Sequence, residues 1–311
     1  MSRDMETPFE LEAICFGALN LDRLYLVDHI SCVDEESYIL GVIEVPGGSA
    51  ANTAVGLARL GIKTGYIGKV ADDKEGSILL EAFKKEGVDV RGVVVSKEGR
   101  SGVVMGYVDL RGNRALYVAP GVNDDLHLSE IDFSYVSAAK IVHLTSFVGD
   151  KPFEAQKTLV KSCRNVKFSL DPGSLYARRG FNGLKDLIEN CYVVLPNDKE
   201  LKQITGLKDY AEGSKRLIDA GVSIVAVKLG SRGCYVTDGD EEYRIKPFAV
   251  NVVDTTGAGD AFNAGFIYGL LRGKSIRECG ILGNYVASRC ISDRGARNGL
   301  PKIADLPPEL M

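Results

Sequence analysis

The chain lacks several features that mark particular classes of protein. No stretch approaches the roughly 18 to 20 consecutive apolar residues that a bilayer-spanning helix needs, and the N-terminus MSRDMETPFELE is acidic, without the apolar core of a signal peptide. We therefore expect no membrane partner and a cytoplasmic location. Internal repeats, low-complexity segments and long linkers are also missing. The 311 residues are enough for one large domain with a small appendage.

Metal-binding and nucleic-acid-binding signatures are missing as well. The seven cysteines are scattered and none forms a C-x-x-C pair, which excludes the usual zinc spacings and argues against a disulfide framework. We expect packed free thiols instead. The three histidines have no partner pattern, and the net charge of -4 argues against nucleic acid as a partner. A nucleotide in a local basic pocket is still compatible with that charge.

What the chain does contain is a regular alternation of short apolar, β-branched runs with helix-like stretches. Runs such as 140–144, 166–170 and 223–229 are separated by patterns typical of amphipathic helices. Apolar strands alternating with helices indicate a mostly parallel sheet that is buried on both faces. We therefore predict an α/β fold, with two helices, at about 258–272 and 276–292, closing the chain.

Two segments interrupt this alternation, because residues 23–45 and 101–119 indicate strands without helices between them. The second is a predicted hairpin, VVMGYVDL and RALYVA, joined at Arg111-Gly112-Asn113. A small β-sheet of this kind, projecting as a lid, would cover a site and exclude water. The alternative is an edge extension of the main sheet. Met105 and Tyr107 lie two apart and are candidates for the lid's inner face.

The run DTTGAGDAFNAGF, residues 254–266, is the most informative stretch. Gly257 and Gly259 allow unusual dihedrals and close approach of a ligand to the backbone. The first amides of the helix that follows have no intrahelical partners and carry partial positive charge, which suits an anion such as phosphate. Beside them, Asp260 could accept a proton from an attacking hydroxyl. These residues predict phosphoryl transfer; the alternative is a strand-to-helix turn in which Asp260 only caps the helix.

Three further motifs are weaker when taken singly. The first, PGGSAAN at residues 46–52, follows a strand that delivers Asn20 and Asp22, and its amide and carboxylate groups suit a polyol. In the second, Asn197 and Glu200 of NDKE stand three apart at a strand end, where they would organise Mg²⁺ through water or form a capping box. The third, KLGSRG at residues 228–233, would place backbone against a nucleotide and a lysine on its phosphates, or form a plain turn.

Together these pieces resemble the PfkB, or ribokinase-like, family of carbohydrate kinases. The motifs GGSAAN (47–52), NDKE (197–200), KLGSRG (228–233) and DTTGAGDAF (254–262) occur in the family's order, and the similarity covers essentially the whole chain. The resemblance implies a three-layer αβα domain with a mostly parallel sheet, formed by residues 1–22, 46–100 and 120–311. A small β-sheet lid, residues 23–45 and 101–119, would hold the sugar against it. Many members pair through their lids, which implies a homodimer.

The resemblance also implies the activity and the role of each matching residue. Family members transfer the γ-phosphoryl group of ATP to a hydroxymethyl or similar hydroxyl of a sugar or nucleoside, with Mg²⁺. Asp260 matches the catalytic base, and the amides of Gly257, Ala258 and Gly259 match the anion hole. The positions that match substrate contacts are Asn20, Asp22, Gly47, Gly48 and Asn52. Those that match the nucleotide and its Mg²⁺ are Asn197, Glu200, Lys228, Gly230, Gly233, Thr256 and Asn284. Asp254 and the loop 296–299 match a region that often holds a monovalent cation, for which K⁺ is the candidate.

The chain departs from ribokinases at two places. Ser49 stands where ribokinases usually carry the lysine of GGKGAN, and Leu144-Thr145-Ser146 lacks the acidic residue that they use on the sugar. Both departures argue against ribose and leave hexoses, deoxy-sugar acids and nucleosides open. The competing hypotheses are a nucleoside kinase that acts on a 5′-hydroxyl and a catalytically silent ligand sensor on the same scaffold.

Overall fold

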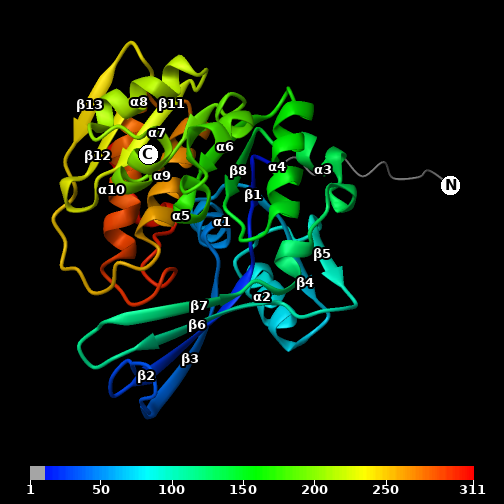
Figure 1. Cartoon of the computed structure of the whole chain (residues 1–311). Helices are drawn as coiled ribbons and strands as arrows, with labels where there is room; N and C mark the ends of the chain where they lie inside the picture. The colour runs from blue at the N-terminus through cyan, green and yellow to red at the C-terminus, as the bar shows by residue number, and fades with distance from the viewer. Residues whose placement is uncertain (1–10) are drawn as a thin grey trace.

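The computed structural model describes residues 11–311 as a large α/β body from which a smaller β-sheet projects (Figure 1). Most of the N-terminal segment used above to judge a signal peptide lies outside the described residues. Within residues 11–311, no helix is long and apolar enough to cross a membrane. All seven cysteines are free thiols, and six of them are buried, as the sequence predicts.

The body is built on a nine-stranded sheet whose strands are parallel from β5 to β11. The last two strands, β12 and β13, pair antiparallel and form one edge. In spatial order the strands are β13 (Glu242–Ile245), β12 (Cys234–Thr237), β11 (Ile224–Lys228), β10 (Val193–Val194), β9 (Lys167–Asp171), β8 (Ile141–Thr145), β1 (Ala13–Phe16), β4 (Thr64–Ala71) and β5 (Val93–Ser96).

Helices cover both faces of this sheet because its central strands are apolar on both sides. One buried cluster joins one face to α3 (Phe133–Ser137), α4 (Asp150–Ser162), α5 (Gly173–Ala177), α6 (Gly180–Ile188), α7 (Asp198–Thr205) and α8 (Tyr210–Asp219). A second cluster joins the other face to α1 (Ser49–Arg59), α2 (Lys74–Lys85), α9 (Ala258–Leu271) and α10 (Ile276–Cys290). Short 3₁₀ turns complete the chain: η1 (Gly121–Asp125), η2 (Leu128–Glu130), η3 (Gly230–Arg232), η4 (Ile303–Asp305) and η5 (Pro308–Leu310). The predicted three-layer α/β fold is confirmed.

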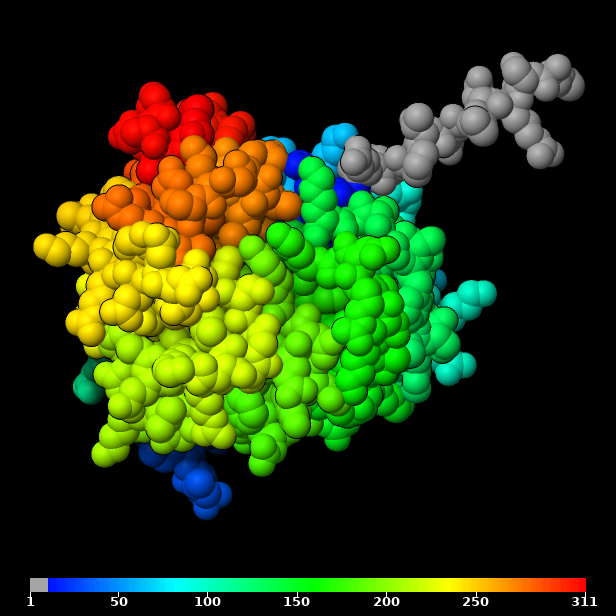
Figure 2. Space-filling view, turned by 90° about the horizontal axis from the view of Figure 1, so that it is seen from above, coloured from blue at the N-terminus to red at the C-terminus, as the bar shows by residue number. Residues whose placement is uncertain are grey.

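The predicted small sheet is also present, with the strand order β3-β2-β6-β7. It consists of β2 (Asn20–Val27), β3 (Ile39–Gly47), β6 (Gly102–Val108) and β7 (Arg114–Ala119). Because it is separate from the nine-stranded sheet, the alternative of an edge extension is wrong. The predicted hairpin turn forms between β6 and β7, where Asp109 accepts hydrogen bonds from the amides of Arg111 and Asn113. In Figure 2 a blue segment from the N-terminal part of the small sheet protrudes beyond the body.

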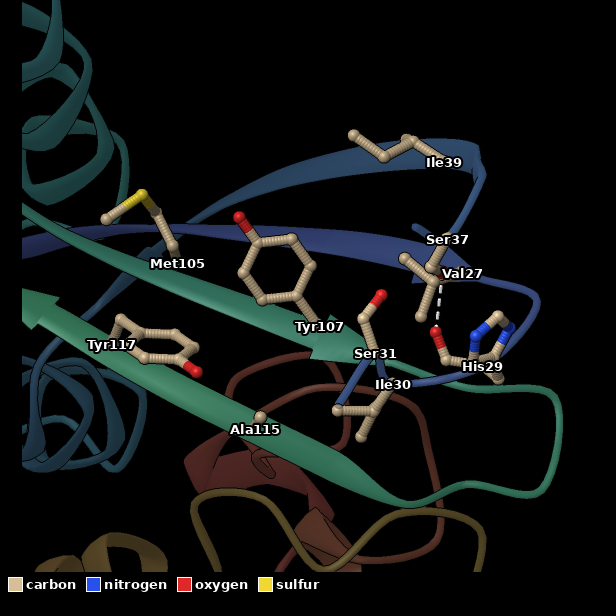
Figure 3. A pocket seen from close by; sticks show the side chains of 10 residues that line it. All are labelled: Val27, His29, Ile30, Ser31, Ser37, Ile39, Met105, Tyr107, Ala115 and Tyr117. Carbon is tan, nitrogen blue, oxygen red and sulfur yellow. Dashed lines mark hydrogen bonds between the residues drawn. The ribbon is translucent and has the colours of Figure 1, made fainter. Parts of the chain in front are cut away.

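The expectation that Met105 and Tyr107 point to the inner face of the small sheet is wrong. Met105 pairs with Arg23 and Tyr117, whereas Asp22 pairs with Val104. Since side chains alternate between faces along a strand, Met105 and Tyr107 lie opposite the face that carries Asp22. There they line a pocket of about 410 Å³ together with Tyr117 (Figure 3).

A single buried asparagine joins the small sheet to the body. The side chain of Asn123, in η1, accepts a hydrogen bond from the amide of Leu19 (2.9 Å) and donates to the carbonyl oxygens of Leu19 (2.8 Å) and Pro120 (3.0 Å). It also donates to Asn20 Oδ1 (3.1 Å). Leu19 precedes β2 and Pro120 follows β7, so Asn123 ties together two strands where they leave the body.

Candidate active site

The run DTTGAGD forms the turn that enters α9, and its shape is held by Asp254. One carboxylate oxygen of Asp254 accepts hydrogen bonds from the amide (2.9 Å) and hydroxyl (2.7 Å) of Thr256, and the other accepts from the amide of Gly295 (2.8 Å). Gly257 follows in the left-handed region, with φ of 77°. A Cβ at this position would lie 2.7 Å from the Cα atom of Ala296. Only glycine fits this turn.

Asp260 lies in the first turn of α9 and faces the N-terminal turn of α1. Its carboxylate accepts hydrogen bonds from the hydroxyl of Ser49 and from Asn52 Nδ2 (2.9 Å). It makes no capping bond to its own helix, so the interpretation of Asp260 as a simple helix cap is wrong. Within the described part of the chain it forms no ion pair, and the residue is partly exposed. A partly accessible carboxylate therefore lies beside the amides that begin α9.

The carboxyl groups of Asp22 and Asp260 both have raised pKa values. Burial raises the pKa of Asp260 to about 6, against the opposing effect of its hydrogen bonds from Ser49 and Asn52. Burial also raises the pKa of Asp22 to about 6; Arg297 lowers this pKa and Asp260 raises it. Asp22 Oδ1 is buried without a hydrogen-bond partner among the described residues. A Cβ at residue 47 would lie 2.3 Å from Asp22 Oδ2, which explains the glycine there.

A buried ion pair lies under the N-terminus of α9. Lys228 Nζ is 2.6 Å from Asp171 Oδ2 and 3.3 Å from Asn263 Oδ1, and Asn263 Nδ2 donates to Asp171 (2.6 Å). Burial alone would lower the pKa of Lys228, but Asp171 and Glu200 outweigh it and raise that pKa. The ammonium group is therefore charged. A Cβ added to Gly259 would lie 3.6 Å from Lys228 Nζ, so the bare backbone leaves space between the helix and this cation.

Asn197 and Glu200 form the capping box that the sequence allowed as an alternative. Asn197 Oδ1 accepts from the amide of Glu200 (2.9 Å), and Glu200 Oε2 accepts from the amide of Asn197 (2.8 Å). Burial raises the pKa of Glu200, and the nearby Asp171 and Asp260 raise it further. Three carboxylates thus share one ammonium group, that of Lys228, and this excess of negative charge suits a divalent cation.

The side chains that could donate oxygen, nitrogen or sulfur ligands determine how such a cation would be held. No group of three or more histidine, cysteine or acidic side chains in residues 11–311 could bind a metal ion directly. Mg²⁺ usually keeps several waters and takes only one or two carboxylates together with substrate phosphates. The residues present therefore fit a water-mediated Mg²⁺, with Glu200 contributing, and do not fit a cage made entirely of protein groups.

The remaining predicted residues are distributed around this centre. Gly48 precedes α1 with φ of 102°, where a Cβ would lie 2.3 Å from the carbonyl oxygen of Ala18. Gly230 and Gly233 flank η3, which joins β11 to the antiparallel β12 as a plain turn. Asn284 Nδ2 donates to the carbonyl oxygens of Ile245 (3.2 Å) and Lys246 (3.1 Å). These contacts explain the local backbone structure around Gly48, Gly230, Gly233 and Asn284. The roles of these residues in ligand binding are proposals.

Several residues of the site were missed as site residues by the sequence reasoning. Ser49 and Arg297 contact the Asp260–Asn52 pair, and Asp171 and Asn263 hold Lys228. Asp171 ends an apolar strand, which is a usable signal at the carboxyl edge of a parallel sheet. Ser49 was noted only as a departure from ribokinases. Arg297 lies in the loop 296–299, which the resemblance connects with a monovalent cation, but it is 245 positions from Asn52, so no local pattern indicates their contact.

The two glycines of the GAG turn provide a matched pair of variants. Gly257→Ala should lower the free energy of unfolding by at least about 1–2 kcal/mol, because the left-handed conformation is costly for alanine and its Cβ meets the backbone of residue 296. Gly259→Ala should leave that free energy unchanged, since its Cβ makes only an ordinary van der Waals contact. Urea unfolding of both variants checks this; equal stability would contradict the assigned turn geometry.

Comparison with known proteins agrees with this geometry. The profile of the pfkB family of carbohydrate kinases matches residues 11–303. A protein of Archaeoglobus fulgidus, named an uncharacterized sugar kinase, is 49% identical over 254 residues, which are 81% of this chain and 100% of the relative. Two solved structures superpose closely. Ribokinase from Thermotoga maritima has a TM-score of 0.86 at 27% identity, covering 94% of this chain and 97% of that one. Arabidopsis thaliana ribokinase, complexed with ribose and ATP, has a TM-score of 0.83 at 25% identity, covering 95% and 97%. The chain therefore belongs to the pfkB family of carbohydrate kinases.

Proposed function

We propose that this kinase transfers the γ-phosphoryl group of ATP to a hydroxyl, most simply a hydroxymethyl, of a sugar or sugar derivative, with Asp260 as the general base. The observation that carries the proposal is the place of the Asp260 carboxylate. It lies at the N-terminus of α9, close to the Lys228 ammonium, and forms no ion pair with any described residue. A carboxylate next to an anion-binding helix end serves both needs of the reaction, a proton acceptor and a site for phosphoryl charge.

Each side chain then has a definite task. Asp260 takes the proton from the acceptor hydroxyl as the hydroxyl oxygen bonds to the γ-phosphorus, and ADP leaves as the bond between the γ-phosphorus and its bridging oxygen breaks. The amides of Gly257, Ala258 and Gly259 donate to the phosphoryl oxygens, and Lys228 neutralises their charge from below. Asp22, with its unpaired Oδ1, accepts from a hydroxyl of the acceptor, and Asn20, Gly47, Gly48 and Asn52 line the same side. Asn197, Thr256, Gly230, Gly233 and Asn284 are assigned to the nucleotide side.

Cofactors follow from the charge of the site. Mg²⁺, when bound with ATP, would neutralise phosphate charge; Glu200, close to Asp171 and Asp260, would hold it through water. Asp254 shapes the loop next to residues 296–299, where a monovalent cation such as K⁺ would bind carbonyl oxygens.

We further propose that residues 23–45 and 101–119 act as a lid on the rest of the chain. The cytoplasmic location stays a prediction from sequence.

A coupled ADP-release screen tests the proposal and identifies the acceptor. The panel should include hexoses, deoxy-sugar acids, ribose and nucleosides. Ser49, which binds Asp260 here, replaces the usual ribokinase lysine, so we expect ribose to be a poor acceptor. Stimulation by nucleosides alone would favour the nucleoside kinase. ATP consumption that no acceptor stimulates would favour the sensor, against which stands the assembled set of Asp260, Lys228 and Glu200.

Replacement of the base is the most direct test of mechanism. Asp260→Asn should reduce kcat by about 10² to 10⁴, the usual contribution of a general base, because the amide cannot take the proton. Its affinity for ADP, measured by calorimetry, should stay within a few-fold of wild type. Asp219→Asn, which alters an exposed ion pair with Lys215, is the matched control. A near-normal kcat for Asp260→Asn would remove this residue from the chemistry.

The pH dependence follows from the raised pKa values. The base must be deprotonated, so kcat/KM should be half-maximal near pH 6, should reach its plateau well above that pH and should fall as the pH drops through about 6. Because Asp22 and Asp260 interact, this acid limb belongs to the pair. Asp22→Asn removes a negative charge near Asp260 and should move the limb to lower pH. An acid limb of wild type near pH 4 would contradict the burial of the base.

Pairing through the lid is proposed from its exposed apolar side chains. Leu26, Ile43, Leu116 and Val118 share the face of the small sheet that carries Asp22, and all are at least 42% exposed. Such a concentration marks an interaction surface. A homodimer is therefore expected by sedimentation equilibrium. Ile43→Lys in the lid should yield a monomer, whereas Val95→Lys, at an exposed valine of β5 in the body, should not. A monomeric wild type would overturn the proposal.

A further inference from the structure

An arginine outside the known motifs reaches the site from the loop that follows α10. Arg297 Nε donates to Asn52 Oδ1 at 2.8 Å, and its Nη2 lies 3.5 Å from the carbonyl oxygen of Gly47. The guanidinium also lies 6.0 Å from the centre of the Phe83 ring. Arg297 thus contacts Gly47, just before α1, and Asn52, in the first turn of α1.

The loop that carries Arg297 is itself held in place. Arg59, at the end of α1, donates from Nη1 to the carbonyl oxygens of Arg297 (2.6 Å) and Leu300 (3.1 Å). Arg59 in turn forms an ion pair with Glu86 at 2.7 Å. The Arg297 side chain therefore starts from a backbone that is fixed to the same helix that it contacts.

This contact decides which way the amide of Asn52 points. A guanidinium has only donors, so the end of the Asn52 amide that faces Arg297 must be the oxygen. The Nδ2 end then faces Asp260 and donates to Oδ2 at 2.9 Å. A reversed amide would place its NH₂ against the guanidinium and its oxygen against the carboxylate, and both contacts would be repulsive.

We propose that Arg297 is a positioning residue for phosphoryl transfer, which fixes the Asn52 amide so that Asn52 orients the Asp260 carboxylate toward the acceptor hydroxyl. The inference rests on the proposed function of Asp260 as the base. It assigns no contact with the substrate to Arg297; the effect passes through Asn52.

Electrostatics adds to this geometry. Burial lowers the pKa of Arg297 to about 10, while Asp22, Glu86 and Asp260 favour its charged form. Removing this cation should raise the pKa of both Asp22 and Asp260. Eight ionisable groups interact electrostatically with Asp260, and each comes from a different part of the fold. They are Cys15 (β1), Asp22 (β2), Tyr66 (β4), Asp171 (β9), Glu200 (α7), Lys228 (β11), Cys290 (α10) and Arg297 (the loop after α10). Of these, only Lys228 and Arg297 are cations, so the loss of Arg297 halves the positive charge around the base.

The test compares Arg297→Met, Arg297→Lys and the exposed-arginine control Arg289→Met on the same acceptor. Arg297→Met should lower kcat about 10- to 100-fold, the scale of a hydrogen bond to a charged group, and should move the acid limb of kcat/KM to higher pH. Its ADP affinity should not change. Arg297→Lys keeps the charge and should keep the acid limb of wild type. Arg289→Met should resemble wild type in every measurement.

A double-mutant cycle separates positioning from a general structural role. If Arg297 positions the base through Asn52, then Arg297→Met/Asn52→Ala should be no slower than Asn52→Ala alone, with kcat measured well above the acid limb, where the base is ionised in every variant. Additive losses, or a wild-type kcat and acid limb for Arg297→Met, would overturn the inference. Should Arg297→Met fail to fold, the cycle is run with Arg297→Gln under the same criterion, because an amide has no charge and can present either its oxygen or its NH₂ to Asn52. Asp260→Asn is measured in parallel: a normal kcat there rejects the proposed base, whereas a slow Asp260→Asn beside a normal Arg297→Met rejects only the role of Arg297.

Discussion

The site depends on the close packing of two helix N-termini, those of α1 and α9. Ser49 and Asn52 of α1 bind the Asp260 carboxylate, and Thr53 Oγ1 donates to the carbonyl oxygen of Asp260 at 3.2 Å. Small residues permit this approach: a Cβ on Gly56 of α1 would lie 2.7 Å from the Cβ of Ala264 in α9. The carboxylate proposed as the base is therefore positioned by residues more than 200 places away in the chain. A larger side chain at this contact would separate the proposed base from the groups that orient it.

Charge balance is the second feature that organises the site. Among residues 11–311, the cations that act on Asp22, Asp171, Glu200 and Asp260 are Lys228 and Arg297, so these side chains together carry excess negative charge. That excess helps to raise the pKa values of Asp22, Glu200 and Asp260, although burial is the larger cause for each. A base with a pKa near 6 is ionised at neutral pH yet remains basic enough to take a proton. The same imbalance leaves room for a cation that arrives with the nucleotide.

Much of the architecture was predictable from local sequence. The alternation of apolar runs and amphipathic stretches predicted the parallel sheet, because both faces of such a sheet must be covered. The turn at 111–113 and the two closing helices also follow from short-range patterns. The antiparallel edge formed by β12 and β13 was not predicted, since the glycine turn before β12 equally suits a nucleotide-binding loop. The prediction that Met105 lies on the inner face of the small sheet was wrong, because a one-residue shift in register exchanges the two faces of a strand.

For the candidate site, local sequence established the residue types and their turns. Local backbone conformation requires glycine at positions 257 and 48. The Asn197–Glu200 capping box likewise depends on hydrogen bonds between residues that are only three positions apart. The partners that give these groups a chemical role lie far apart: Lys228 with Asp171, Asp260 with Ser49, and Asn52 with Arg297. Such contacts depend on how strands and helices pack in space, and no local pattern encodes that. The sequence thus defined the glycine turn and its aspartate, whereas the raised pKa, the orientation and the charged neighbours of that aspartate arise only when the fold brings distant segments together.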